Sequence, residues 1–331
     1  MIRSFLKSPK GLFITFSISL IILFTLTLSY LDSSNNGKVL RGAPHQGTYQ
    51  SFTTSHDELK RTYDVYVPST LSSNGPAIFV FHGSYGRSEE MRWITGHDFE
   101  YLAEEKGFLV VYPQGYKNFW NDCRASADYV ANTDNIDDVG FFRKIVKKIT
   151  IDFNVDPSKI LVTGISNGGH MTYKLAFEIP EEVFLVAPLV ANLPVEANND
   201  CTPSNKPVNM MIFNGTNDPI NPYEGGLVKL LGNTSRGSVL SSEDTYKYWV
   251  NLANASLEEV FNFEERDGDI KTSVIRKLSK GEKVVALYTL VNSGHVVATP
   301  NANLGTNYGG NAGDIVTANE IFSLYEKLLE Q

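Results

Sequence analysis

One short stretch of the sequence has the residue types of a catalytic nucleophile. The segment GISNG, residues 164–168, brackets Ser166 with glycines and follows the apolar run of residues 159–164. Where a buried strand turns sharply into a helix, this pattern exposes the serine hydroxyl at the tip of the turn. The chain has 26 glycines, so the same pattern also arises by chance in an ordinary strand-to-helix turn. Whether Ser166 is a nucleophile or an ordinary turn residue depends on whether the chain also supplies a base and an acid for it.

The candidate base follows from elimination among the histidines. A serine hydroxyl attacks only when a base takes its proton, and on such turns an acid and then a histidine follow the serine in the chain. Of six histidines, only His170 and His295 follow Ser166. His170 lies four residues on, in the same turn and helix, and leaves no room for an intervening acid. His295, just after the apolar segment 283–291, is therefore the predicted base.

Asp218 is the best placed acid between these two residues. It follows the apolar run MMIFNG in a turn rich in Asn, Gly and Pro, which puts it at the carboxyl end of a strand. Asp267 and Asp269, in RDGD, are typical of a hairpin turn instead. Asp218 could also be an ordinary Asx-turn residue. Its position between Ser166 and His295 favours a catalytic role.

Two backbone N–H groups are candidates for an oxyanion hole. The first belongs to Asn167, directly after the nucleophile. The second should come from the loop after the buried strand FVF, in HGSYG, residues 82–86. There Ser84 is favoured over Tyr85, and His82 is interpreted as a structural residue that fixes the loop.

Other classes of site are not supported. The histidines do not have the HExxH spacing of a metal site, and no glycine-rich phosphate loop follows a strand. A net charge of −8 leaves no basic surplus for nucleic-acid phosphates. We therefore expect no metal, no cofactor and no nucleic-acid partner.

The segments around these residues alternate between strand and helix patterns. An alternating strand is predicted at 61–67, and buried or late strands at 76–83, 107–113, 159–164, 207–215, 257–265 and 283–291. Helices are predicted around the apolar stripe 142–149, after the acidic segment 134–138, and over the C-terminal 317–328. Thr317 and Glu320 have the spacing of a capping box. The alternation predicts an α/β fold, with a mainly parallel sheet flanked by helices.

The N-terminus has a different composition. Residues 1–11 are basic, residues 12–31 are apolar without a single charge, and residues 32–44 are a polar linker. The apolar length suits a membrane-spanning helix, so a signal anchor is favoured over a cleaved signal peptide. The catalytic domain, residues 45–331, would then be extracytoplasmic: periplasmic or at the cell surface, and secreted if the helix is cleaved.

The two cysteines agree with export. Cys123 and Cys201 are an even pair, which outside the cytoplasm often forms a disulfide. Two separate buried thiols are the alternative, because sequence does not show that the two lie close together.

With these motifs in order, the chain resembles α/β-hydrolases of the secreted polyhydroxybutyrate depolymerase and feruloyl esterase group, which includes the LpqC-like proteins. The resemblance covers most of residues 45–330. It implies a triad of Ser166, Asp218 and His295 and an oxyanion loop at HGS. The motifs that carry it are RTYDVYVP, FVFHGSYG, EEKGFLVVYPQG, FWNDC, DDVGFF, VDPSKILVTGISNGGHM, FNGTNDPINPYEGG, YKYWV and SGH.

The resemblance also suggests residues for the substrate pocket. Trp120 matches a family position that can line the pocket, with a core tryptophan as the alternative. Val296 stands where family members often have a motif with tryptophan, and Tyr85 belongs to the oxyanion loop. We expect the loop 300–313 to lie beside His295 and shape the entrance.

The predicted function is extracytoplasmic serine ester hydrolysis on a small or oligomeric ester, through an acyl-enzyme. A serine peptidase or acyltransferase would use the same triad. A catalytically inactive binding module, anchored to the membrane, is the alternative from a different class. The sequence does not choose among short-chain, hydroxybutyrate and hydroxycinnamoyl esters.

Overall fold

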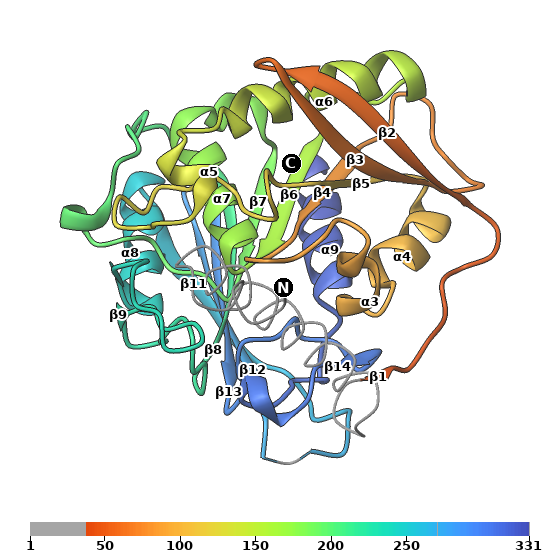
Figure 1. Cartoon of the computed structure of the whole chain (residues 1–331). Coiled ribbons are helices and arrows are strands. Elements are labelled where there is room, and N and C mark those ends of the chain that lie inside the picture. The colour runs from red at the N-terminus through yellow and green to blue at the C-terminus, as the bar shows by residue number, and fades with distance from the viewer. Residues whose placement is uncertain (1–37, 270, 331) are drawn as a thin grey trace, which may run out of the picture.

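The computed structural model describes residues 38–269 and 271–330. Their centre is a ten-stranded sheet in the order β11-β12-β13-β8-β7-β6-β4-β5-β3-β2 (Figure 1). The strands are β2 (Thr48–His56), β3 (Leu59–Val67), β4 (Ala77–Phe81), β5 (Leu109–Pro113), β6 (Ile160–Ile165), β7 (Leu185–Leu189), β8 (Asn209–Gly215), β11 (Ser256–Asn262), β12 (Ser273–Lys280) and β13 (Val284–Val291).

The six central strands are parallel, and antiparallel strands flank them on both sides. Strands β13, β8, β7, β6, β4 and β5 run in one direction. Strands β2 and β3 extend one edge, and β11 and β12 extend the other. Every strand predicted from the sequence is present, whereas β2, β7 and β12 of this sheet were not predicted. The mainly parallel α/β-hydrolase fold is confirmed.

Helices cover both faces of the sheet, as the buried strands require. The side chains of β4 show this division, because Phe79 and Phe81 join one apolar cluster whereas Ile78 and Val80 join the other. The first cluster includes α6 (Asp138–Phe153), α7 (Asn167–Glu178) and α8 (Ser242–Leu252); the second includes α3 (Glu90–Ile94), α4 (Asp98–Lys106) and α9 (Thr317–Leu329). The remaining elements are β1 (Lys38–Val39), α5 (Val130–Thr133), η1 (Pro180–Glu182), η2 (Glu196–Asn198), β9 (Gly226–Leu227), β10 (Ser238–Val239), β14 (Ala302–Asn303) and η3 (Thr306–Tyr308).

Of the two helix N-termini for which the sequence predicted stabilising side chains, the structure agrees at α6 and differs at α9. At α6 the Asp137 carboxylate accepts the Gly140 N–H at 2.8 Å, so the acidic segment does cap this helix. The capping box at α9 is wrong. Thr317 is the first helical residue, and its hydroxyl donates to the Ala298 carbonyl at 2.7 Å. Glu320 accepts from the Tyr288 hydroxyl instead, so tertiary partners take both side chains.

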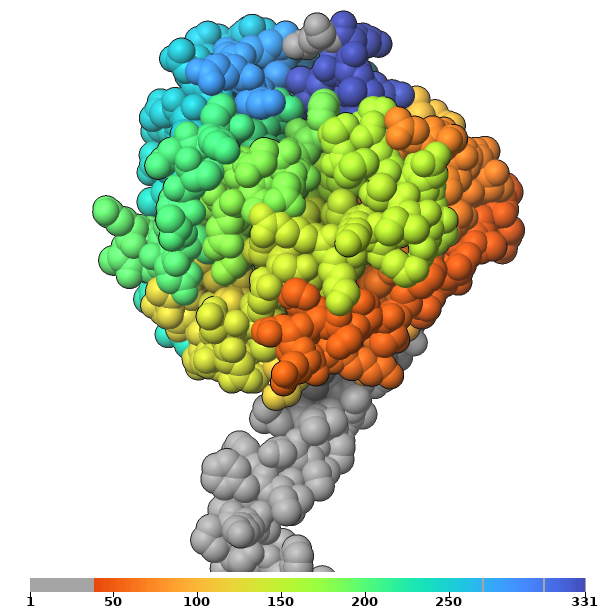
Figure 2. Space-filling model, turned by 90° about the horizontal axis from the view of Figure 1, so that it is seen from above, coloured from red at the N-terminus to blue at the C-terminus, as the bar shows by residue number. Residues whose placement is uncertain are grey.

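The β2 strand packs beside α6 at the molecular surface, where Figure 2 shows their orange and yellow-green atoms in contact. His56 Nε2 and the Asp137 carboxylate lie 3.0 Å apart across this junction. The pair joins the antiparallel edge of the sheet to a helix that covers one of its faces.

Cys123 and Cys201 form a disulfide, with their Cα atoms 5.0 Å apart and a sequence separation of 78. Closing a loop of this length stabilises the fold by about 4 kcal/mol on the chain-entropy account. The alternative of two free thiols is therefore excluded.

The basic segment 1–11, the predicted anchor 12–31 and residues 32–37 of the linker lie outside the described residues. Among residues 38–269 and 271–330, no helix combines the length and apolar character needed to cross a bilayer.

Candidate active site

Four sequence-predicted site segments meet at one edge of the sheet. The segment HGS follows β4, Ser166 follows β6, Asp218 follows β8, and His295 follows β13. These four strands are parallel, and they lie in the order β4-β6-β7-β8-β13, in which β7 is the one strand that carries none of the four segments (Figure 1). Their carboxyl ends therefore face the same side, which is where open α/β sheets bind ligands.

Ser166 lies on a strained turn between β6 and α7. Its backbone has φ +57° and ψ −117°, which is unfavourable for any residue with a side chain. Its N–H donates to the Leu189 carbonyl at 2.9 Å, and its carbonyl accepts the His170 N–H at 2.8 Å. A Cβ atom at Gly168 would overlap the Phe81 carbonyl oxygen, so the turn needs glycine there. This is the geometry of a nucleophile elbow.

The Asp218 and His295 side chains form a buried pair. His295 Nδ1 lies 2.7 Å from Asp218 Oδ2, and the exposed fractions are 5% for His295 and 9% for Asp218. The other carboxylate oxygen, Oδ1, accepts the N–H groups of Ile220 and Asn221, both at 2.8 Å. With the carboxylate accepting from Nδ1–H, the imidazole keeps Nε2 available to take a proton.

The loop 300–313 does lie beside His295, as expected. The His295 N–H donates to the Tyr308 carbonyl at 2.6 Å. Within the described residues, Ser166 Oγ and His295 are not hydrogen-bonded to each other. In enzymes without bound substrate, this contact is often long and tightens only in the complex.

His82 shapes the loop after β4. Its side chain is fully enclosed, and burial lowers its pKa to about 4, so the ring is neutral near pH 7. Nε2 accepts the Gly115 N–H at 2.9 Å, which leaves Nδ1–H to donate to the Gly83 carbonyl at 2.7 Å. These contacts confirm the structural role inferred for His82.

The same loop reaches the turn that carries Ser166. A Cβ atom built at Gly83 would lie 3.5 Å from the Ser166 Cβ, which puts the two segments side by side. The Tyr85 N–H donates to the Asn118 carbonyl at 2.9 Å, so it is already occupied and Ser84 remains the better candidate donor. The Asn167 N–H lies at the first residue of α7, where helix N–H groups have no partner within the helix.

A buried hydrogen-bond network around the Asn167 side chain was not predicted. The Asn167 Oδ1 accepts the Trp120 N–H at 2.9 Å, and its Nδ2 donates to Asp122 Oδ2 at 2.7 Å. Asp122 also accepts from Arg124 and from the Tyr129 hydroxyl. The motif FWNDC marked this segment in the sequence, but its contact with the nucleophile turn depends on tertiary structure.

Charge pairing keeps the centre of this network ionised. Burial opposes ionisation of Asp122, but the adjacent Arg124 guanidinium outweighs it and holds the pKa of the carboxyl well below its usual range. Arg124 in turn has its pKa raised by Asp122 against the effect of burial. The network therefore fixes Asn167 through ionic as well as neutral hydrogen bonds.

His170 is a buried helix residue, as the sequence suggested. Burial lowers its pKa well below the usual value, and the positive charge of Arg124 acts in the same direction. The ring is neutral near pH 7 and does not replace His295 in the Asp218 pair.

Of the three predicted pocket residues, only Tyr85 offers surface to a ligand. It is 41% exposed, and its ring packs edge-on against Phe119 at 4.7 Å. Trp120 has no exposed surface, because its ring packs against Phe81 and its indole N–H donates to the His82 carbonyl. Val296 is 1% exposed. The pocket assignments of Trp120 and Val296 are therefore wrong, and Trp120 is the core tryptophan.

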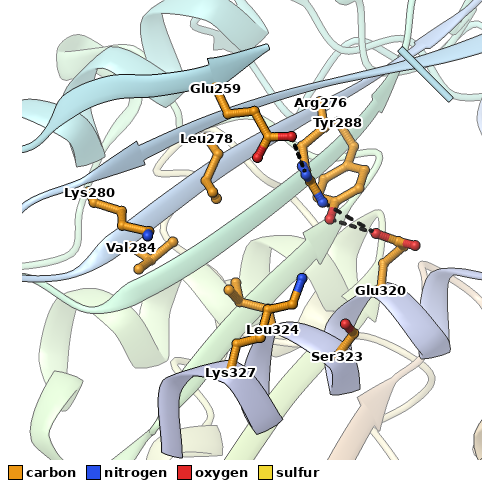
Figure 3. Close-up of a pocket in the computed structure, with 10 residues that line it drawn as sticks. All are labelled: Glu259, Arg276, Leu278, Lys280, Val284, Tyr288, Glu320, Ser323, Leu324 and Lys327. Carbon is orange, nitrogen blue, oxygen red and sulfur yellow. Dashed lines mark hydrogen bonds and ion pairs between the residues drawn. The ribbon is translucent and has the colours of Figure 1, made fainter. Parts of the chain in front are cut away.

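A separate pocket lies between the β11–β13 edge and α9 (Figure 3). Three of its charged residues have polar partners within the pocket: Arg276 contacts Glu259 at 3.0 Å, and Glu320 accepts from Tyr288 at 2.9 Å. No member of the proposed triad is among its lining residues, which are Glu259, Arg276, Leu278, Lys280, Val284, Tyr288, Glu320, Ser323, Leu324 and Lys327.

One acidic group among the described residues has the spacing of a metal site. Ligand atoms of Glu265, Asp267 and Asp314 all lie within 4.8 Å of one another. Two of the three residues are exposed, and exposed acidic groups of this kind are common without an ion. None of them belongs to the segments that carry Ser166 or His295.

Comparison with known proteins identifies relatives among carbohydrate esterases. Acetylxylan esterase A of Talaromyces purpureogenus is 28% identical over 174 residues, covering 52% of this chain and 44% of that protein. Acetylxylan esterase A of Aspergillus oryzae is 30% identical over 169 residues, covering 48% and 53%. Feruloyl esterase B of Piromyces equi is 24% identical over 226 residues, covering 66% and 39%.

The similarity to these relatives covers only part of their length. The chain spans about half the length, or less, of these curated relatives. An acetyl xylan esterase structure from Aspergillus awamori superposes with a TM-score of 0.49 at 18% identity, covering 76% of this chain and 95% of that chain. No family model matches the sequence. Over about half of its length, the chain is therefore similar in sequence to acetylxylan and feruloyl esterases.

Proposed function

We propose that the protein is a serine hydrolase that cleaves carboxylic esters through a triad of Ser166, His295 and Asp218. The observation that carries the proposal is the buried contact of 2.7 Å between His295 and Asp218, at the same sheet edge as the strained Ser166 turn. Structural serines rarely need a positive φ, whereas a nucleophile elbow does.

The reaction follows from the orientation of these groups. His295 Nε2 takes the Ser166 proton while Ser166 Oγ attacks the ester carbonyl carbon. Asp218 accepts from Nδ1–H and stabilises the imidazolium that forms. The N–H groups of Ser84 and Asn167 stabilise the oxyanion, a contribution of about 3 kcal/mol for each donor.

The attack gives a tetrahedral intermediate. When this intermediate collapses, the alcohol leaves and takes its proton from His295. The acyl group is then held on Ser166. A water molecule gives a proton to His295 and attacks the acyl carbonyl, and the carboxylic acid leaves as Ser166 recovers its proton. Atoms and charges balance without a metal or an organic cofactor.

The substrate class is drawn from the relatives. Two of them are named for acetylxylan and one for feruloyl esters, so acetyl or hydroxycinnamoyl esters of carbohydrate are the first substrates to test. Hydroxybutyrate oligomers belong to the same panel, because the sequence motifs are shared with that group. An extracytoplasmic location is part of the proposal, supported by the Cys123–Cys201 disulfide and the uncharged segment 12–31.

A substrate panel tests the proposal. Purified protein is assayed with p-nitrophenyl acetate, acetylated xylan, methyl ferulate and a hydroxybutyrate trimer, next to a peptide substrate. We expect ester turnover that is lost in Ser166→Ala and kept in Ser158→Ala, which changes an exposed serine in the turn before β6. Peptide cleavage without ester cleavage would instead support the peptidase alternative.

A further inference from the structure

Arg236 is a buried arginine that forms no ion pair with an acidic side chain in the described part of the chain. It is 3% exposed, and its Nε and Nη1 have no hydrogen-bond partner among the described residues. The other two fully buried arginines differ, because Arg61 pairs with Asp138 at 2.7 Å and Arg124 pairs with Asp122 at 2.5 Å. A buried guanidinium without a partner is costly, and a bound anion would supply the missing hydrogen bonds and charge.

Arg236 lies on the nucleophile's side of the molecule. Its guanidinium carbon is 5.6 Å from the centre of the Tyr129 ring, and the Tyr129 hydroxyl accepts from the Asn167 side chain at 3.2 Å. Asn167 is the residue after the nucleophile. The charges of both Arg236 and His295 also act on His170, which lies one helical turn from Ser166.

A second buried polar side chain without a partner lies in the same loop region. Asn221 is 3% exposed, and neither its Nδ2 nor its Oδ1 is bonded among the described residues. Its own N–H donates to Asp218, so it lies directly beside the proposed triad.

Backbone hydrogen bonds connect the segments that carry Asn221 and Arg236. Lys229 N–H donates to the Ile220 carbonyl at 2.9 Å, and Val228 N–H donates to the Gly237 carbonyl at 3.0 Å. The Arg236 carbonyl is fixed by the Asn198 side chain at 3.0 Å. The loop that presents the guanidinium is therefore held in place, as a preformed binding group requires.

We propose that Arg236 is a substrate-recognition residue that binds a free carboxylate of the ester, with the Asn221 amide as a second donor. The guanidinium fork matches a carboxylate with two parallel hydrogen bonds, which a neutral group cannot reproduce. The preferred substrates are then esters with an acid group close to the scissile bond. This inference rests on the proposed ester hydrolase activity and specifies its substrate class.

The carboxylate can belong to the acyl part or to the alcohol part, and two substrate pairs distinguish them. Monoethyl succinate is compared with ethyl succinamate for the acyl side. For the alcohol side, 3-acetoxybutyrate is compared with 3-acetoxybutyramide. Within each pair a carboxylate is replaced by an amide of nearly the same size, so the ratio of kcat/KM values measures carboxylate recognition.

The expected result is a preference of roughly 10- to 100-fold for the acid in at least one pair, the range of a charge-assisted hydrogen bond to a buried group. In Arg236→Gln this ratio falls to near one, and in Arg236→Lys it is intermediate. Arg143→Gln, which removes an exposed arginine paired with Glu182, keeps the wild-type ratio. A wild-type ratio near one in both pairs would overturn the proposal, as would an unchanged ratio in Arg236→Gln.

Binding and a neutral ester separate this inference from the proposed function. Calorimetric titration should show that succinate binds the wild-type protein and binds Arg236→Gln at least tenfold more weakly. This measurement does not depend on catalytic activity. Absence of wild-type binding contradicts the carboxylate site. Absence of p-nitrophenyl acetate turnover while succinate still binds contradicts the hydrolase proposal and leaves Arg236 as a carboxylate site.

Discussion

Replacing Asn167 by alanine tests how the nucleophile turn is held. The side chain makes hydrogen bonds to the backbone N–H and carbonyl of Trp120, to Asp122 and to Tyr129. Removing it leaves the Trp120 N–H and one Asp122 oxygen without this partner in a fully buried site. Each unsatisfied group costs about 1–3 kcal/mol. Because Asp122 keeps Arg124 and Tyr129, we expect a total loss of about 2–4 kcal/mol in unfolding free energy.

Activity should fall together with stability. The Asn167 N–H is a proposed oxyanion donor, and loss of one such donor costs about 10²–10³ in kcat. Urea unfolding followed by tryptophan fluorescence gives the free energy, and p-nitrophenyl acetate hydrolysis gives kcat. Asn251→Ala, on the exposed face of α8, is the matched control and should change stability by less than about 0.5 kcal/mol.

Two outcomes would refute this reasoning. A loss of stability below about 1 kcal/mol would mean that the network around Asp122 does not depend on Asn167. A normal kcat in a variant that is destabilised as expected would mean that the turn does not need this support for catalysis.

Three further predictions follow from the site. Asp218→Asn should lower kcat by about 10³–10⁴-fold, measured with a neutral ester, because the imidazole loses the acceptor that orients it; a loss below tenfold would contradict the triad. His82 has a folded pKa of about 4, below its unfolded value, so the unfolded state binds more protons and stability falls as pH drops from about 6.5 towards 4. Urea titrations should show a His82 contribution on the order of 2 kcal/mol lost between pH 6.5 and 5, and His82→Gln should flatten this part of the profile. Reducing the Cys123–Cys201 disulfide, or replacing both cysteines by serine, should lower the unfolding free energy by about 4 kcal/mol, and an unchanged urea midpoint would show that the bridge does not constrain the unfolded chain.

The central parallel strands were predictable because each is buried on both faces. Strands such as β4 and β6 therefore appear as continuous apolar runs, and the polar residues after them mark the catalytic edge. By contrast, β12 is half-exposed and rich in charge, with Arg276 and Lys277 at its centre, and so lacks that signal. Its pairing with β13 depends on long-range register rather than on local composition.

The candidate site was predictable where chain order constrained it. Only one histidine could follow both Ser166 and Asp218, so elimination identified His295 before its contact with Asp218 was seen. Burial could not be inferred in the same way. Trp120 was assigned to the pocket because a motif position was matched, and only tertiary packing shows that its ring is enclosed.

The unpaired arginine shows the same limit. Nothing in the sequence around Arg236 separates it from an ordinary surface arginine, since its significance comes from burial and from the absence of a partner among the described residues. Whether a buried charge has a partner depends on side chains that are distant in sequence, and local sequence patterns do not show them.

The most direct test of the central claim is fluorophosphonate labelling followed by peptide mass spectrometry. A fluorophosphonate reacts only with a serine that an adjacent base activates, so labelling reports the triad without any assumption about the substrate. We predict a single adduct on the peptide that contains Ser166, lost in Ser166→Ala and strongly reduced in His295→Ala. Labelling of another serine, or no labelling of folded protein, would contradict the assignment of Ser166 as the nucleophile.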